Sequence, residues 1–226
     1  MSINVVDKID GMVKVRHVLL SVSDKSGLEV FVPRLMEINP DVKFFSTGGT
    51  YSRLREILGD AAGASLSQVS AYTGQPETQG GLVKTLDFKI YLGLLTETYN
   101  EAHQADLART QSVAIDMVVV NLYPFKETIA REGVTVEQAR GNIDIGGPCM
   151  IRASAKNFIR VASVVDPGNY QDILADMAAN SGSLSLDLRF RLAQKAFGHT
   201  AEYDSTIRDF LGEQSIQDVN TCYNKL

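Results

Sequence analysis

Cysteine, positive charge and long apolar segments are all scarce in this sequence. Its 226 residues include two cysteines, Cys149 and Cys222, which give neither a disulfide framework nor a metal-binding spacing. The net charge of −5 argues against nonspecific nucleic-acid binding as the main task. No apolar run of about 18 residues, the length a membrane span needs, is present, and the first residues are polar and charged. We therefore expect a cytoplasmic protein that binds neither nucleic acid nor membrane.

Signatures of several enzyme classes are also missing. The sequence has no zinc, iron–sulfur or calcium spacing, no nucleophile elbow and no dinucleotide-binding fingerprint. It has no internal repeat. Its hydrophobic content of 44% is sufficient for the core of one large domain. We expect a loosely held leader at 1–14 and a single domain at 15–226.

Strand-like and helix-like segments alternate along the chain. Apolar runs rich in β-branched residues predict buried strands, and apolar residues at helical spacing predict helices. We expect strands at 15–22, 42–46, 68–70, 115–120 and 161–165, and helices at 28–38, 51–58, 136–140, 148–157, 168–179 and 186–211. This alternation predicts an α/β fold with a mostly parallel sheet flanked by helices, followed by a C-terminal helical region.

Polar turns follow two of the predicted strands. SDKSG (23–27) offers hydroxyl groups and the Lys25 ammonium, and STGGT (46–50) offers hydroxyl groups and glycine backbone. The carboxyl ends of parallel strands lie at one edge of the sheet, where ligands of open α/β sheets bind. Together the two turns predict a phosphate site. For the first turn alone, a helix cap made by Ser23 or Asp24 is an equally good interpretation.

The stretch GNIDIGGPCMIRASAKN (141–157) concentrates charge and glycine. Gly146 and Gly147 predict a tight turn and a close approach to a ligand, and the helix after them would start with an anion-attracting N-terminus. Arg152 and Lys156, spaced i,i+4, share one helix face. Their charges repel, and an anion or Asp144 between them would offset this repulsion. The alternative is a surface helix with a solvated basic face.

Two further segments bring polar groups towards the same edge. Lys84 and Thr85 follow the glycine pair Gly80–Gly81 at the end of a turn-rich section. The strand at 115–120 runs into Asn121 and Tyr123, and Pro124 then prevents continuation of the ladder. Lys84 is either an ordinary solvated lysine or a functional group.

These motifs, in this order and at about this spacing, resemble the IMP cyclohydrolase domain of the bifunctional purine enzyme AICAR transformylase/IMP cyclohydrolase. The resemblance covers residues 16 to about 212 and rests on SVSDKSG (21–27), STGGT, GGLVKTL (80–86), NLYPF (121–125), IDIGGPCMIRASAKN (143–157) and LAQKAFGHTAEYD (192–204). It implies a methylglyoxal-synthase-like α/β domain. It also implies the last step of de novo purine synthesis, in which FAICAR closes its ring, loses water and becomes IMP.

The resemblance also implies roles for individual residues. The substrate phosphate would be held by Ser21, Ser23, Lys25, Ser46, Gly48, Gly49 and Thr50. The base would be surrounded by Lys84, Thr85, Asn121, Tyr123, Asp144, Gly146, Gly147 and Lys156. We expect Lys84 to stabilise negative charge on the formyl oxygen, helped by backbone N–H groups near Tyr123. Asp144 and Lys156 would form a coupled pair that orients the carboxamide and moves its proton.

This scheme requires no metal and no redox cofactor. The resemblance implies FAICAR as substrate and IMP as product. The bifunctional enzyme is more than twice as long, so we expect a stand-alone cyclohydrolase whose formyl transfer is made by a separate formyltransferase protein. A homodimer is one assembly compatible with the resemblance.

The segment around Lys84 departs from the family pattern. Leu82 stands where the family has arginine, Asp87 and Tyr91 where it has histidines, and Phe88 where it has proline. Less positive charge near a phosphate would weaken substrate binding, and Lys89 would compensate in part. The departures favour an alternative, a noncatalytic purine-nucleotide-binding module of the same fold. Methylglyoxal synthase activity is a third hypothesis, which the NLYPF and IDIGG segments do not support.

Overall fold

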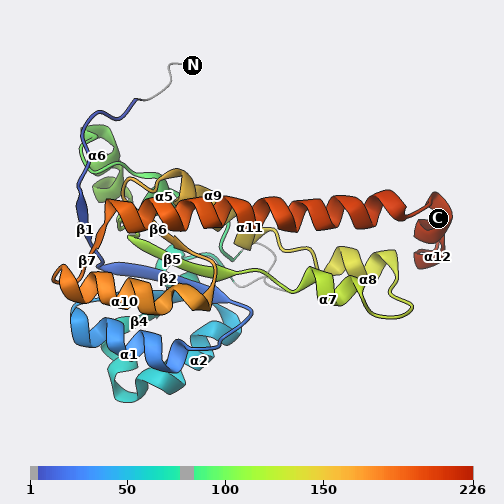
Figure 1. Cartoon of the computed structure of the whole chain (residues 1–226), viewed down its shortest axis with the longest axis horizontal. Coiled ribbons are helices and arrows are strands. Elements are labelled where there is room, and N and C mark those ends of the chain that lie inside the picture. Colours follow the sequence, from blue (N-terminus) through green and yellow to red (C-terminus); the bar gives the residue numbers. More distant parts are fainter. Residues whose placement is uncertain (1–4, 77–83, 226) are drawn as a thin grey trace.

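The computed structural model describes residues 5–76 and 84–225, and its centre is a parallel sheet (Figure 1). The sheet has five strands in the order β4-β3-β2-β5-β6. Their bounds are β2 His17–Val22, β3 Lys43–Ser46, β4 Leu66–Gln68, β5 Met117–Asn121 and β6 Ala162–Val164. All four pairings are parallel, and they place Val22 opposite Asn121 and Leu20 opposite Ser46. The predicted α/β fold with a parallel sheet is confirmed.

Helices cover both faces of this sheet. The helices are α1 Leu28–Ile38, α2 Gly48–Leu58, α3 Ala62–Ser65, α4 Val69–Thr73, α5 Phe88–Leu95, α6 Glu101–Thr110, α7 Phe125–Ile129, α8 Val136–Gly141, α9 Gly146–Lys156, α10 Tyr170–Ala179, α11 Leu186–Glu213 and α12 Ile216–Cys222, with short 3₁₀ turns at Gly59–Ala61 and Pro167–Asn169. In Figure 1, α1, α2 and α10 lie below the sheet, whereas α5, α9 and α11 lie above it.

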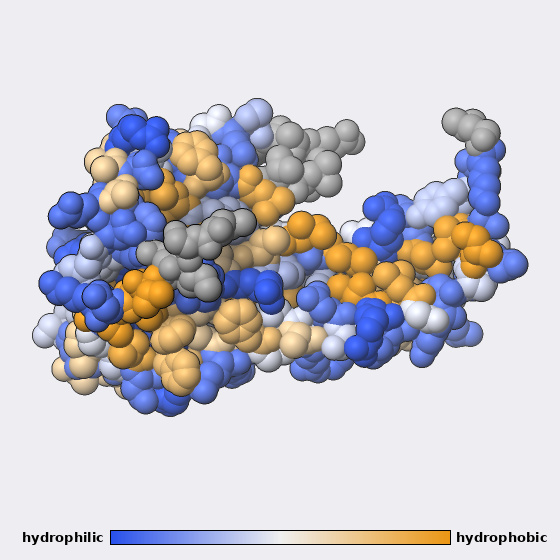
Figure 2. Space-filling view, turned by 90° about the horizontal axis from the view of Figure 1, so that it is seen from above, coloured by the Kyte–Doolittle hydropathy of each residue, from blue (hydrophilic) through white to orange (hydrophobic). Residues whose placement is uncertain are grey.

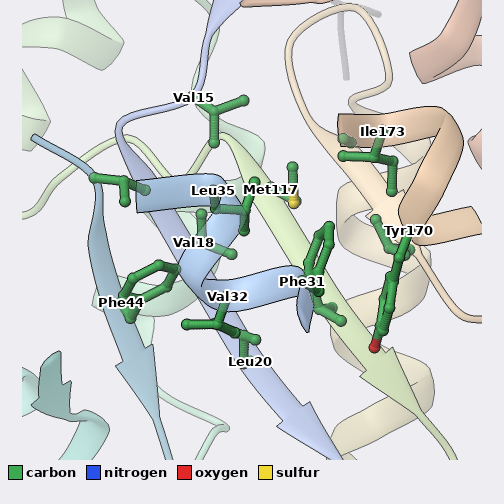
Figure 3. Packing of buried hydrophobic residues seen from close by; sticks show 14 of the residues in the cluster. Val15, Val18, Leu20, Phe31, Val32, Leu35, Phe44, Met117, Tyr170 and Ile173 are labelled. Carbon is green, nitrogen blue, oxygen red and sulfur yellow. The ribbon is translucent and has the colours of Figure 1, made fainter. Parts of the chain in front are cut away.

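Each face of the sheet has its own apolar core. On the α1 side, side chains of β2 and β3 pack against α1 and α10, and the rings of Phe31 and Tyr170 stack with centroids 4.1 Å apart (Figure 3). On the other face, Leu19, Val118 and Val120 pack with residues of α5, α9 and α11. Successive strand residues point to opposite faces, which is why apolar runs without polar alternation form these strands.

Several boundaries differ from the sequence expectations. The strand expected at 68–70 lies at Leu66–Gln68, and the chain turns into a helix at Val69. The helices expected from 51 and 148 begin at Gly48 and Gly146, so both glycine pairs belong to helical first turns. The patterns did not predict α7, α12 or the short strands β1 Met12–Lys14 and β7 Ser183–Ser185.

The expectation of a loose leader to residue 14 is wrong for its last part. Strand β1 pairs antiparallel with β7, and Val13 is buried. Arg189 of α11 fixes the preceding residues, because its fully buried guanidinium donates to four backbone carbonyls. The acceptors are Asp10 (2.8 Å), Phe158 (3.1 Å), Ile159 (3.2 Å) and Leu184. One side chain therefore joins the N-terminal segment, β7, α11 and the loop after α9.

The far half of α11 extends beyond the sheet. Figure 1 shows α7 and α8 beneath this half and α12 at its end. Seen from above, this arm stands out from the main body and carries apolar residues along its surface (Figure 2); Leu211 and Ile216 are among the exposed ones. None of the helices in the described part of the chain combines the length and apolarity that a membrane crossing requires.

We predict that Arg189→Met lowers the free energy of unfolding by on the order of 3 kcal/mol, because buried carbonyls lose their donors. The control is Arg191→Met on the same helix, which removes only an exposed ion pair with Asp187 and should cost less than about 1 kcal/mol. Urea unfolding of the two variants measures the difference. Equal losses would show that the carbonyl cluster around Arg189 is not important for stability.

Candidate active site

Three loops meet at the carboxyl edge of the sheet and enclose a cavity of about 350 Å³. They follow β2, β3 and β5, and their convergence results directly from the parallel pairing of these strands. The loop before α9 and the residues at Lys84 and Thr85 complete the wall. The described lining includes these residues predicted from the sequence: Ser21, Ser23, Lys25, Gly49, Thr50, Lys84, Thr85, Asn121, Tyr123, Asp144, Gly146 and Gly147.

One end of the cavity has a charge and a geometry that suit an anion. Gly48 and Gly49 form the first turn of α2, whose N–H groups attract anions. The Lys84 Nζ atom lies 3.3 Å from the position that a Cβ atom would take at Gly48, and the Lys25 Nζ atom lies 3.9 Å from that position at Gly49. Two ammonium groups thus lie beside one helix N-terminus, an arrangement suited to a phosphate group.

Two of the predicted hydroxyl groups bond to the backbone of β2. The fully buried Ser46 donates to the Leu20 carbonyl at 2.8 Å and does not line the cavity. The Thr50 hydroxyl donates to the carbonyl of Val22 and accepts from its N–H, both at 3.0 Å, so it fastens α2 to the end of β2. Ser21 lies 3.2 Å from the Thr47 hydroxyl at the cavity wall.

Asn121 is also a structural residue. Its side-chain oxygen accepts from the N–H groups of Ser23 (2.7 Å) and Asp24 (2.9 Å), and its amide nitrogen donates to the Asp24 carbonyl (2.9 Å). The amide therefore fixes the SDKSG turn to the end of β5. Neither Ser23 nor Asp24 caps α1: its N-cap residue is Gly27, and the Asp24 carboxylate accepts instead from Ser26 N–H at 2.9 Å.

Gly146 and Gly147 are needed for close approach and not for a turn. Neither has a positive φ, and both are helical. A Cβ atom at Gly146 would lie 2.4 Å from Thr85 Oγ1, and one at Gly147 would lie 2.5 Å from Asp144 Oδ2. The predicted tight turn is wrong, and the close neighbours of these glycines are side chains of this protein; the predicted approach to a ligand stays a prediction.

Asp144 is the half-buried carboxylate of the cavity. Its Oδ1 atom accepts from Gly147 N–H at 2.9 Å, and its own N–H donates to the Tyr203 hydroxyl at 2.8 Å. Burial raises the pKa of Asp144 above its ordinary value, while the Gly147 N–H and the charge of Lys84 act in the opposite direction. A carboxylate with a raised pKa is better suited to accept a proton near neutral pH.

The structure does not form the expected Asp144–Lys156 pair. Lys156 is the last residue of α9, exposed and outside the cavity lining. Its Cα is about 15 Å along the helix axis from Gly146, given the rise of about 1.5 Å per residue. Arg152 lies over the Phe197 ring of α11 at 5.7 Å and also stays outside the lining. The lysine whose charge acts on Asp144 is Lys84.

The departures around Lys84 lie mostly away from the cavity. Asp87 is buried, caps α5 by accepting from Lys89 N–H at 2.8 Å, and does not line the cavity. Lys89 contacts Tyr72 and does not line the cavity. Tyr91 and Phe88 are also outside the lining. Gly80, Gly81 and Leu82 lie outside the described residues.

Sequence reasoning missed part of the lining. The additional residues are Val22, Thr47, Gly141, Ile143, Ile145 and Met150. Thr47 could have been found, because it lies within the STGGT turn. Ile145 is 59% exposed and Tyr123 52% exposed, so two large side chains border the polar cavity and could contact a planar ring.

A larger cavity of about 780 Å³ lies on the other side of Asn121, between the same sheet edge and α11. Lys195 and Asp166, two of its charged residues, pair with each other at 2.6 Å. Because the described residues that line it include no cluster of cations, we place the site in the smaller cavity. Within the described part of the chain, no three His, Cys, Asp or Glu side chains come together as a metal site.

Comparisons with known proteins agree with this arrangement. The model of the MGS-like domain matches residues 27–149, more than half of the chain, which therefore belongs to the family of MGS-like domains. The model of the AICARFT/IMPCHase bienzyme matches residues 154–225. The resemblance noted in the sequence is confirmed.

Two individual proteins give closer comparisons. The bifunctional purine biosynthesis protein PurH of Synechococcus sp. (strain CC9605) is 47% identical over 197 residues, which are 87% of this chain and 37% of that protein. The crystal structure of ForH is 30% identical with a TM-score of 0.71, over 87% of this chain and 98% of that one. This chain thus spans little more than a third of the curated relative, and it is related to an enzyme of purine biosynthesis.

We predict that Gly146→Ala destabilises the protein by about 1–3 kcal/mol, because the new methyl group would overlap Thr85 Oγ1. Adding Thr85→Ala should restore part of the loss. Gly212→Ala on α11 is the control, since a Cβ atom there meets open space. Thermal unfolding measures all three variants, and an unchanged melting temperature for Gly146→Ala would contradict the close approach.

Proposed function

We propose that this chain is an IMP cyclohydrolase, which closes the ring of FAICAR and releases water to give IMP. The observation that supports this most is one cavity that holds Asp144, Lys25 beside the α2 N-terminus, and the Lys84 ammonium, which lies near Gly48 and also acts on the Asp144 carboxylate. A nucleotide could thus have its phosphate at the α2 N-terminus and its reacting groups near Asp144, with the Lys84 ammonium close to both. The relation to PurH, a protein of purine biosynthesis, points to the same pathway.

The phosphate end would bind the 5′-phosphate of the substrate. Lys25, Lys84 and the N–H groups of α2 supply positive charge, and the hydroxyl groups of Ser21, Ser23 and Thr47 lie beside them. Charge-assisted hydrogen bonds of this kind are the strong ones. Thr50, Ser46 and Asn121 would act indirectly by holding the loops.

Ring closure joins the carboxamide nitrogen to the formyl carbon of the same molecule. Most of the entropy of bringing the two groups together is already lost, so the protein mainly selects a near-attack conformer. Attack places negative charge on the formyl oxygen. The Lys84 ammonium would stabilise that charge, with backbone N–H groups near Tyr123 as further donors.

Asp144 would accept the proton that leaves the carboxamide nitrogen. Its raised pKa favours this role, and Lys84 takes the place that the resemblance assigned to Lys156 as its charged neighbour. The formyl oxygen then leaves as water, with one proton from the carboxamide nitrogen and one from the formamide nitrogen. These steps balance without a redox partner.

We predict that Lys84→Ala lowers turnover of FAICAR roughly 100- to 1,000-fold, as does the loss of one oxyanion donor elsewhere. IMP binding should fall much less, because Lys25 and the N–H groups of α2 remain at the phosphate end. Lys156→Ala should stay within a few-fold of the unchanged protein, because Lys156 lies outside the cavity. Lys43→Ala is the control for loss of a surface charge, because the exposed Lys43 begins β3 at the end of the sheet away from the cavity.

Ultraviolet detection of IMP formed by the purified chain, with calorimetry of IMP binding, separates the alternatives. Binding of IMP without conversion of FAICAR would support the noncatalytic nucleotide-binding module and refute the enzyme. Equal losses of turnover and affinity in Lys84→Ala would make Lys84 a binding residue. A large loss of turnover in Lys156→Ala would reinstate the coupled pair.

The pH dependence of kcat/KM tests Asp144. Its folded-state pKa is raised, so its proton-accepting form should be lost at a higher pH than for an ordinary aspartate as the pH falls. We expect an acid limb above the usual aspartate range near 4, and Asp144→Asn should remove that limb and lower turnover by roughly 100- to 10,000-fold. An acid limb that persists unchanged in Asp144→Asn would assign it to another group.

A further inference from the structure

The segment matched by the bienzyme model lies outside the cavity wall. All described residues that line the cavity fall between Ser21 and Met150, whereas the bienzyme match covers residues 154–225. Helix α11 belongs to this second segment, and it reaches the site through Tyr203. Tyr203 itself does not line the cavity.

Tyr203 holds the backbone of the carboxylate residue. Its hydroxyl oxygen accepts from the Asp144 N–H at 2.8 Å, and the residue is 9% exposed. Asp144 is thus fixed twice, at its main chain by Tyr203 and at its carboxylate by Gly147 N–H. The side chain has little freedom once both bonds are made.

The ring of Tyr203 supports a second wall of the cavity. It meets the buried ring of Phe125 edge to face, with centroids 6.1 Å apart, and Phe125 meets Phe210 in the same way at 6.0 Å. Phe125 begins α7 directly after the loop that contains Tyr123. One side chain of α11 therefore contacts both the Asp144 loop and the anchor of the Tyr123 loop.

We propose that Tyr203 is a positioning residue that sets the Asp144 carboxylate against the reacting group, a role that rests on the proposed cyclohydrolase function. The contact requires the hydroxyl as well as the ring, since the ring alone leaves the Asp144 N–H without its acceptor. Displacement of a catalytic group by about 1 Å is enough to lower a rate substantially.

The matched control is Tyr72. Its hydroxyl accepts from the Val113 N–H at 2.9 Å, its ring packs on Phe45, and neither Tyr72 nor Val113 lines the cavity. Tyr203→Phe and Tyr72→Phe each remove one hydroxyl acceptor from a backbone N–H. We expect similar falls in melting temperature, but only Tyr203→Phe should lower kcat, on the order of 10- to 100-fold, with KM nearly unchanged.

A second readout is independent of catalysis. The Asp144 carboxyl is titrated by carbon-13 NMR in the full chain; among the described residues, Lys84 and Tyr203 are the charged or titratable groups that act on it. Loosening of the loop admits water, so the pKa should fall in Tyr203→Phe and stay in Tyr72→Phe. Phe125→Leu, which leaves the Tyr203 hydroxyl in place, should lower the pKa of Asp144 by a smaller amount. This variant takes the place of Tyr203→Phe if the latter does not fold.

The outcomes separate the two proposals. A selective kcat loss together with a selective shift of the Asp144 titration supports the positioning role. If Tyr203→Phe behaves like Tyr72→Phe in both readouts, the role is refuted. If the unchanged protein does not convert FAICAR, the proposed function fails, and the titration alone then decides whether Tyr203 positions Asp144.

Discussion

The parallel pairing of β2 with both β3 and β5 is the constraint on which the site depends. It brings the SDKSG turn, the STGGT turn and the NLYPF loop to one edge, although they lie far apart in the sequence. Asn121 then fixes two of them to each other through three hydrogen bonds. Without this register, neither the anion end of the cavity nor its opposite wall would form.

The sequence predicted these features to different extents. Helix α1 lies at the expected 28–38 because its ends coincide with a glycine and with the residues before a proline. The convergence of the loops was predictable because parallel strands share a carboxyl edge. The partners of individual side chains were not: Ser46 and Thr50 have the residue types of a phosphate site but bond to the backbone of β2. Such choices depend on tertiary contacts, which a linear pattern does not contain.

Lys156 shows the limit of spacing arguments. An i,i+4 relation correctly places Arg152 and Lys156 on one face of α9, but it does not say which surroundings that face has. Asp144 precedes the helix and Lys156 ends it, so the length of the helix separates the pair that the resemblance implied. The resemblance to a family thus identified the motif correctly, but not the distances between its side chains.

Several glycines of the site leave space that a polar group from another part of the chain occupies. The space beside Gly48 holds the Lys84 ammonium, the space beside Gly146 holds the Thr85 hydroxyl, and the space beside Gly147 holds the Asp144 carboxylate. Each missing side chain thus fixes the position of a polar group from elsewhere in the chain. The polar groups of the cavity are thus positioned partly by residues that are usually associated with flexibility.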